Sequence, residues 1–150
     1  MATEVRKFRS LVKTWLGTIS GLSARVGTRI YPVAPPIEFM QPALCFNIAA
    51  RESVSDIGAP AWVATVEFII HAASEDVADE IEELIVNTAT IQEDGALQTA
   101  LTDANTVQTT SFVLRSVNQD WHDAYESGGF VIFVRVVSFS ASFVKRVNAW

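Results

Sequence analysis

The segment F-V-I-F-V-R-V-V-S-F-S-A-S-F-V, residues 130–144, is the strongest strand signal in this chain of 150 residues. Alternate residues of a strand point to opposite faces of a sheet. Near the start of the segment both sets are apolar, with Ile132 and Val134 on one side and Val131 and Phe133 on the other. The pattern predicts a central strand that is covered on both faces.

The elements around this strand follow from the period of the apolar residues and from turn residues. Ser74 is suited to cap a helix, and Glu75 and Asp76 favour the positive end of its dipole. Together they predict an α+β fold, a mainly antiparallel four- to five-stranded sheet with two main helices packed on it as a sandwich. We expect a single domain, 1–150, with 145–150 as a C-terminal arm. The expected elements are a helix over 3–23, a short extended piece near 31–32, strands over 44–51 and 62–71, a helix over 75–90, a short helical turn over 96–101 and a strand over 106–117, with loops at 52–60 and 118–129.

Composition narrows the class of protein. Apolar residues make up 49% of the chain and the mean hydropathy is +0.25, yet there is no apolar run of the roughly 18 residues that a membrane span needs. The excess of apolar residues indicates either a subunit interface or a large sheet with two covered faces. The formal net charge of −6 disfavours a dedicated nucleic-acid binder. The N-terminus lacks the apolar core of a signal peptide, and Cys45 has no partner for a disulfide; both fit a protein made and used in the cytoplasm.

Charge is unevenly distributed along the chain. Residues 1–30 are strongly basic, whereas residues 74–94 hold acids and no basic residue. Such polarity matches the positive face of one copy to the negative face of the next, or it marks two solvated helix faces. The candidate interface residues on the two helices are Arg6, Arg9, Lys13, Glu75, Asp79 and Glu82.

No pattern in the sequence indicates catalysis. His71 and Cys45 sit among strand residues and are expected to be structural. His122 lies between Asp120 and Asp123 in a polar loop, which is a poor cage for a metal. There is no nucleophile elbow and no phosphate-binding glycine loop. We therefore expect no enzyme activity, no metal and no cofactor.

The tryptophans are candidate anchors for contacts between proteins, because this residue is enriched at interfaces. Trp15 falls on the apolar stripe of the first helix and is expected in the core. Trp62 opens a strand, Trp121 lies in the polar loop and Trp150 is the last residue of the sequence. For Trp121 two interpretations remain open, an interface anchor or a side chain that folds back on its own hairpin.

The connection between the first helix and the first long strand is rigid. It reads G-T-R-I-Y-P over residues 27–32, continues with A-P-P over 34–36, and enters the strand with Q-P-A-L over 41–44. Prolines fix φ and bias the preceding residue toward extended backbone. Arg29 and Tyr31 in this segment are further candidate interface residues.

This stretch resembles the tail terminator (tail completion) proteins of tailed bacteriophages. In that family a leading helix is followed by a Val-x-x-Arg-Ile-Tyr-Pro-like segment, a stretch with prolines and a strand that opens with proline and an aliphatic residue. The order of elements agrees along the whole chain, while the distinctive residues lie in about 26–50. The match is carried by Val26, Arg29, Ile30, Tyr31, Pro32, Pro35, Pro42 and Leu44.

The resemblance implies a virion structural protein without enzyme activity, assembled in the host cytoplasm and located at the tail or neck. It would form a homo-oligomeric ring, typically a hexamer, on the head-proximal end of the tail tube. There it would stop polymerisation of the tube and join tail to head. The implied partners are the tail tube protein, a neck or connector protein and, in contractile tails, the sheath protein, with genomic DNA passing through the channel and no membrane.

Two other functions remain open. Another neck or head-completion protein, a connector adaptor, would share a small α+β fold and ring assembly. A small ferredoxin-like regulatory domain would instead need a ligand pocket lined by a few convergent polar groups.

Overall fold

A computed structural model describes residues 3–32, 42–54, 60–92, 95–103, 106–117, 123–127 and 130–145. Its strands form one sheet with the order β1-β2-β3-β6-β4, and β5 pairs with β6 beside this path. The pairing of β1 with β2 is parallel and every other pairing between strands is antiparallel. The strands are β1 (Ile30–Pro32), β2 (Ala43–Val54), β3 (Pro60–Ala72), β4 (Val107–Val117), β5 (Asp123–Ser127) and β6 (Phe130–Lys145).

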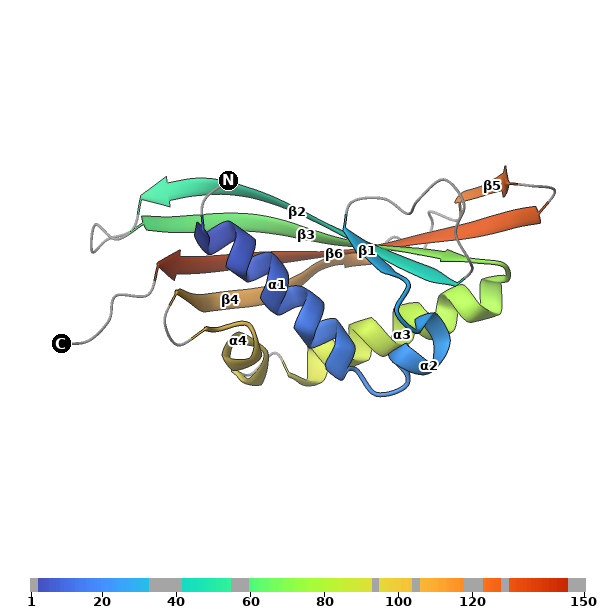
Figure 1. The fold of residues 1–150 in the computed structure, drawn as a ribbon, viewed down its shortest axis with the longest axis horizontal. Coiled ribbons are helices and arrows are strands. Elements are labelled where there is room, and N and C mark those ends of the chain that lie inside the picture. Colours follow the sequence, from blue (N-terminus) through green and yellow to red (C-terminus); the bar gives the residue numbers. More distant parts are fainter. Residues whose placement is uncertain are drawn as a thin grey trace.

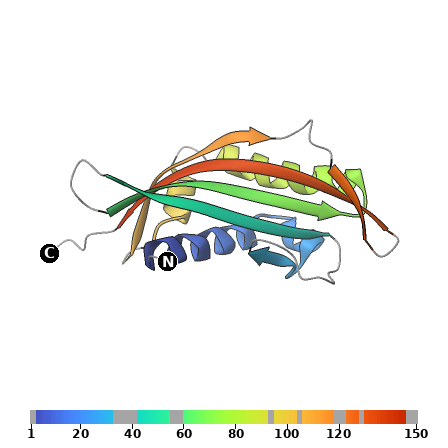
Figure 2. The same cartoon turned by 90° about the horizontal axis from the view of Figure 1, so that it is seen from above.

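The helices lie together on one side of this sheet, as Figure 1 shows. Seen from above in Figure 2, α1 lies along the β2 side of the molecule and α3 lies along the other side. The predicted mainly antiparallel α+β fold is therefore confirmed. The helices are α1 (Thr3–Thr18), α2 (Leu22–Val26), α3 (Glu75–Ile91) and α4 (Ala96–Ala100).

The first helix is shorter than predicted. The expected span of 3–23 is divided after Thr18, where the hydroxyl donates to the Trp15 carbonyl at 2.6 Å. Gly21 then adopts a left-handed conformation with φ of 85°, which a glycine reaches without steric cost. The chain turns there and α2 follows as a separate short helix.

The second main helix begins where it was expected. The Ser74 hydroxyl accepts a hydrogen bond from the Val77 amide at 3.3 Å, which satisfies one of the free amides of the first turn.

Two predictions about the last strands need correction. Strand β5 occupies part of the loop expected over 118–129 and continues the outer pairing of β6 beyond β4. Strand β6 is central, but Val131 is 51% exposed, so its start is not covered on both faces.

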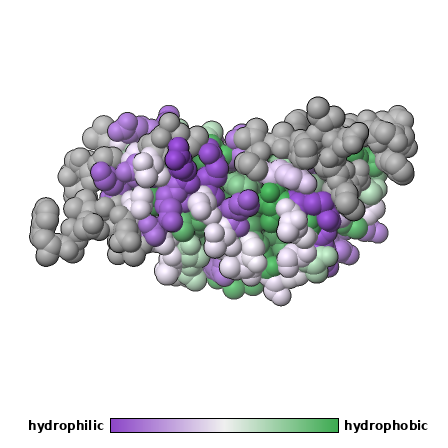
Figure 3. All heavy atoms as spheres, in the orientation of Figure 1, coloured by the Kyte–Doolittle hydropathy of each residue, from purple (hydrophilic) through white to green (hydrophobic). Residues whose placement is uncertain are grey.

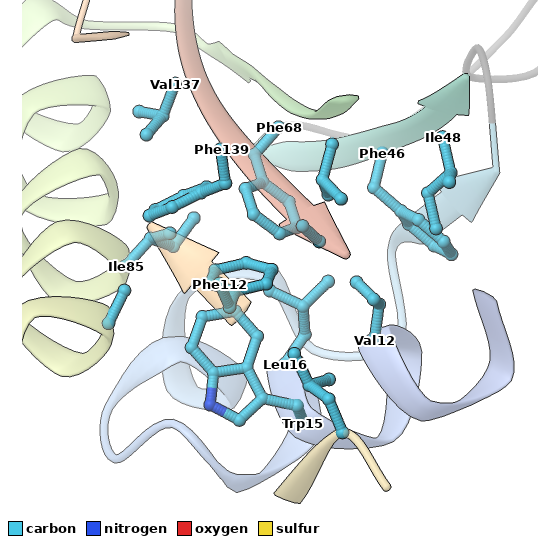
Figure 4. Packing of buried hydrophobic residues seen from close by; sticks show 14 of the residues in the cluster. Val12, Trp15, Leu16, Phe46, Ile48, Phe68, Ile85, Phe112, Val137 and Phe139 are labelled. Atoms are coloured by element: carbon cyan, nitrogen blue, oxygen red, sulfur yellow. The ribbon is translucent and has the colours of Figure 1, made fainter. Parts of the chain in front are cut away.

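Aromatic side chains fill the space between α1 and the sheet (Figure 4). Phe8 of α1 stacks on Phe143 of β6 with ring centroids 4.4 Å apart. Trp15, one turn from the end of α1, lies 6.1 Å from Phe68 and 6.0 Å from Phe112. Aromatic pairs contribute about 0.5–1.5 kcal/mol beyond the area they bury. These contacts fix α1 across β3, β6 and β4, and Trp15 is a core residue as predicted.

We predict that Phe143→Ala destabilises the protein by about 3–5 kcal/mol, because it removes a buried ring that touches both Phe8 and Trp62 and leaves a cavity. Urea unfolding followed by tryptophan fluorescence measures the change. Val131→Ala on the same strand is the matched control, and its cost is expected to stay below about 1 kcal/mol because the side chain is half exposed. Equal costs for both variants would contradict the assigned core.

Candidate interaction surfaces

A buried arginine connects the central strand to the acidic helix. Arg135 of β6 is 1% exposed and projects from the helix-covered face of the sheet, the face it shares with Val137 and Phe139. Its Nε lies 3.4 Å from Asp79 Oδ1, and its Nη2 lies 3.8 Å from Glu75 Oε1. Its Nη1 donates to the Val134 carbonyl at 3.3 Å.

The two carboxylates that face Arg135 remain about half exposed, with side-chain exposures of 57% for Glu75 and 54% for Asp79. A buried guanidinium without counter-charges would carry a large desolvation cost. Two acids that the sequence assigned to a possible interface therefore have a role inside the chain. The signal that points to this is an arginine in the middle of the apolar run 130–137, a position where an unpaired cation is rarely tolerated.

Arg25 and Arg29 hold the connection between α2 and β2. The Arg29 Nε donates to the Pro42 carbonyl at 2.8 Å, and its Nη2 donates to the Arg25 carbonyl at 3.1 Å. The Arg25 Nε lies 3.0 Å from Glu80 Oε2 on α3. Arg29, predicted as an interface residue, thus connects the end of α2 to the start of β2 by hydrogen bonds within the chain. Glu80 is a third acid of α3 that has a partner within the chain.

Three cations of α1 differ from these arginines, because they face outward without a partner in the described part of the chain. Arg6, Arg9 and Lys13 follow one another at three- and four-residue spacing and therefore share one face of the helix. None of the three has an ion pair within the described part of the chain. Together with Ser10 and the buried Phe46 of β2 they line a hollow of about 300 Å³. Figure 3 shows a hydrophilic cluster over the N-terminal half of α1.

The sheet face away from the helices is a second surface. In the described residues no helix packs on it. A hollow of about 310 Å³ on this side is lined by the small side chains of Ala49, Thr65 and Ser140 and by two exposed arginines. These are Arg51 of β2 and Arg115 of β4, whose Nη1 donates to Thr65 Oγ1 at 3.5 Å.

The predicted aromatic anchors are placed differently from one another. Trp62 is 7% exposed and stacks on Phe143 at 5.5 Å, so in the single chain it belongs to the core. Tyr31 lies in β1 and is half buried. Trp121 and Trp150 lie outside the described residues, as do His122 and the expected arm beyond Lys145.

Little in the described residues suggests chemistry. No group of three or more metal-binding side chains occurs among them, and none of their helices is long and apolar enough to cross a membrane. Burial lowers the pKa of His71 and raises the pKa of the Cys45 thiol to about 11. A thiol with such a pKa is a poor nucleophile at neutral pH.

Comparisons with known proteins identify a similar fold. No protein-family model matches the chain, and no curated protein matches it in sequence. Among solved structures, a chain from the "Virion of native gene transfer agent (GTA) particle" matches with a TM-score of 0.64. The match covers 97% of this chain and 100% of that chain, at 13% sequence identity. Identity this low shows a common fold alone.

We predict that the double variant Glu75→Gln/Asp79→Asn destabilises the protein by about 1–3 kcal/mol, because it leaves Arg135 buried without a counter-charge. The expected cost is below that of a fully buried pair, since water screens the half-exposed carboxylates. Asp76→Asn/Glu83→Gln on the same helix removes the same charge from exposed positions and is the control. Arg135→Met should cost less than Glu75→Gln/Asp79→Asn, because it removes the buried charge itself. Chemical unfolding that ranks the control above the test pair would refute this role.

We predict that burial of the Cys45 thiol makes the protein less stable at alkaline pH. The pKa of the Cys45 thiol is raised from 9.0 to about 11 in the folded chain. The contribution of the thiol to the free energy of unfolding is therefore complete below pH 9.0 and is lost as the pH rises toward 11. The loss should be on the order of 2–3 kcal/mol relative to Cys45→Ala, which has no ionising thiol. Unfolding free energies of both proteins between pH 7.5 and about 10.5 test this. Parallel pH profiles would show that the thiol is not buried.

Proposed function

We propose that this chain is a structural protein of a phage-like particle and acts as a tail terminator. The observation that carries the proposal is the fold likeness, which extends over the full length of a chain in a gene transfer agent virion particle. A likeness that covers 97% of this chain and 100% of the other is what two versions of one building block would give. The Arg-Ile-Tyr-Pro segment at 29–32 supports the choice of terminator among such proteins.

In this role the chain has no reaction to catalyse and assembles into a ring, for which the resemblance to the terminators implies six copies. A ring needs head-to-tail contacts, so each copy presents two different complementary patches. The α1 cations Arg6, Arg9 and Lys13, which have no ion pair within the described part of the chain, supply one patch. On α3 the exposed Asp76 and Glu83 and the half-buried Glu82 supply the other, with Glu75 and Asp79 shared between this face and Arg135. A stable contact buries on the order of 800 Å² on each partner.

The other proposed partners follow from the position of a tail terminator between the tail tube and the head. The ring would rest on the last ring of the tail tube protein, and the sheath protein would lie outside it in a contractile tail. Its upper surface would receive the neck or connector protein. Genomic DNA would pass through the channel, and the net charge of −6 suits passage, because a wall without surplus cations does not hold phosphates.

Particles assembled without this protein test the proposal. We expect tail tubes of uneven, often excessive length that fail to join heads, and restoration of both properties by the wild-type gene. Electron microscopy measures tube length and head attachment. Tubes of uniform length that attach to heads would exclude a terminator. Gold labelling of a tagged copy then separates the two neck positions: label on the connector itself, with normal tubes in the deletion, would indicate a connector adaptor.

A further inference from the structure

Among the described residues, nothing pairs with most of the outer edge of the sheet at β2. Strand β1 pairs only with Leu44, Cys45 and Phe46, while β3 pairs with all of β2 on the other side. From Asn47 to Val54, β2 has no second strand partner among the described residues. An unpaired edge presents free backbone amides and carbonyls to any extended chain that approaches it.

The backbone groups that face this edge can be assigned. The Leu44 amide donates to the Arg29 carbonyl at 3.0 Å, so it points toward the β1 side of β2. Amide and carbonyl directions alternate along a strand, and the pairing of β2 with β3 runs from Ala43 to Val54 without a bulge. The amides and carbonyls of Ile48, Ala50 and Glu52 therefore point outward.

The two outer edges of the sheet differ in protection. The pairing of β4 with β6 contains two register shifts. The outer side of β4 is also occupied locally, because the Thr109 amide donates to Thr102 Oγ1 at 3.2 Å and Val107 forms a bridge with Asp103. By contrast, the open part of β2, N-I-A-A-R-E-S-V, has no proline, no lysine and no bulge, and its only charges are the neighbouring Arg51 and Glu52. Prolines, bulges and charges, lysine above all, are the devices that commonly block an edge.

Helix α1 forms a shelf beside the open edge (Figure 2). The hollow between them is lined by Arg6, Arg9, Lys13 and, from β2, Phe46, which is where the pairing with β1 ends. A strand added at about 4.8 Å from β2 would direct alternate side chains onto this shelf. Those side chains would meet three cations that have no ion pair in the described part of the chain, around an apolar floor.

We propose that the β2 edge binds an extended acidic segment of another protein, which adds to the sheet as a strand. Its backbone pairs with Ile48, Ala50 and Glu52, and the alternate side chains that face α1 are carboxylates flanking an aliphatic residue. A second copy of this chain is a poor source of the segment, because the clustered acids of the described residues lie on α3, a helix. The proposal goes beyond the role in a tail and does not depend on it, and because the ring contact would use the same α1 cations, the two contacts compete for this surface.

Binding of a designed peptide to the purified full chain tests this. The probe is a blocked, fluorescently labelled Thr-Glu-Thr-Val-Thr-Glu-Thr, which places Glu, Val and Glu on one face; its control carries Lys in place of Glu. Fluorescence anisotropy at low salt should show binding of the acidic probe at least tenfold tighter than of the control. Hydrogen exchange should slow at the amides of Ile48, Ala50 and Glu52 when the acidic probe is bound.

Methylated peptides separate strand addition from simple charge attraction without changing the protein. One probe carries N-methyl groups on Glu, Val and Glu, and another carries them on the intervening Thr residues. A strand offers alternate amides to opposite sides, so one set should weaken binding at least tenfold and the other set should leave it within about twofold. Equal binding of both methylated probes would overturn the proposal.

Protein variants locate the site. Arg9→Glu/Lys13→Glu should weaken binding of the acidic probe at least tenfold, while Arg51→Glu/Arg115→Glu, with the same change in charge on the open sheet face, should not. Ala50→Pro removes an outward amide and leaves the β3 pairing intact, so it should block binding with little change in the unfolding midpoint. Tighter binding of a DNA oligonucleotide than of the acidic probe, with unchanged exchange at the β2 amides, would assign the cations to nucleic acid and refute strand addition.

Discussion

The burial of one sheet face beneath α1 and α3 is the constraint on which the other features depend. Phe8 and Trp15 of α1 pack on Phe143, Phe68 and Phe112, so the helix has one position across the strands. With both main helices on that face, the opposite face and the outer part of β2 are left without cover among the described residues. The same packing that stabilises the fold therefore decides which surfaces are available to other molecules.

Arg135 shows how a charge is accommodated within this arrangement. It projects from the most apolar strand onto the covered face, where desolvation of a guanidinium is costly, and α3 begins beside it with Glu75 and Asp79. The pairing fixes the N-terminal turns of α3 against β6, in addition to the Ser74 cap. It also removes part of the acidic face that the sequence offers to a neighbouring copy, so α1 and α3 are less well matched as a contact pair than their total charges indicate.

The sequence predicted the main elements because their signals are local. The apolar spacing of α1, the Ser74 cap of α3 and the alternation in β2, β3 and β6 each depend on residues close together in the chain. What it missed depends on contacts between distant residues. Strand β5 is polar and short and is defined by its pairing with β6. The partners of Arg135 lie more than fifty residues earlier, and the role of Arg29 depends on Pro42 being folded back beside it. Of the candidate interface, the α1 cations are placed together as expected, whereas Trp62 joins the core.

The position of the α1 cations also affects how copies of this chain meet. Two open β2 edges that paired about a two-fold axis would bring two sets of Arg6, Arg9 and Lys13 toward each other, because each set borders its own edge. Repulsion between like charges at such a contact opposes symmetric edge pairing, which is the usual hazard of an unprotected strand. An acidic segment is attracted to the same edge, since its carboxylates neutralise the cations of α1 while its backbone pairs with β2. The same three side chains thus disfavour self-association through β2 and favour a partner of opposite charge.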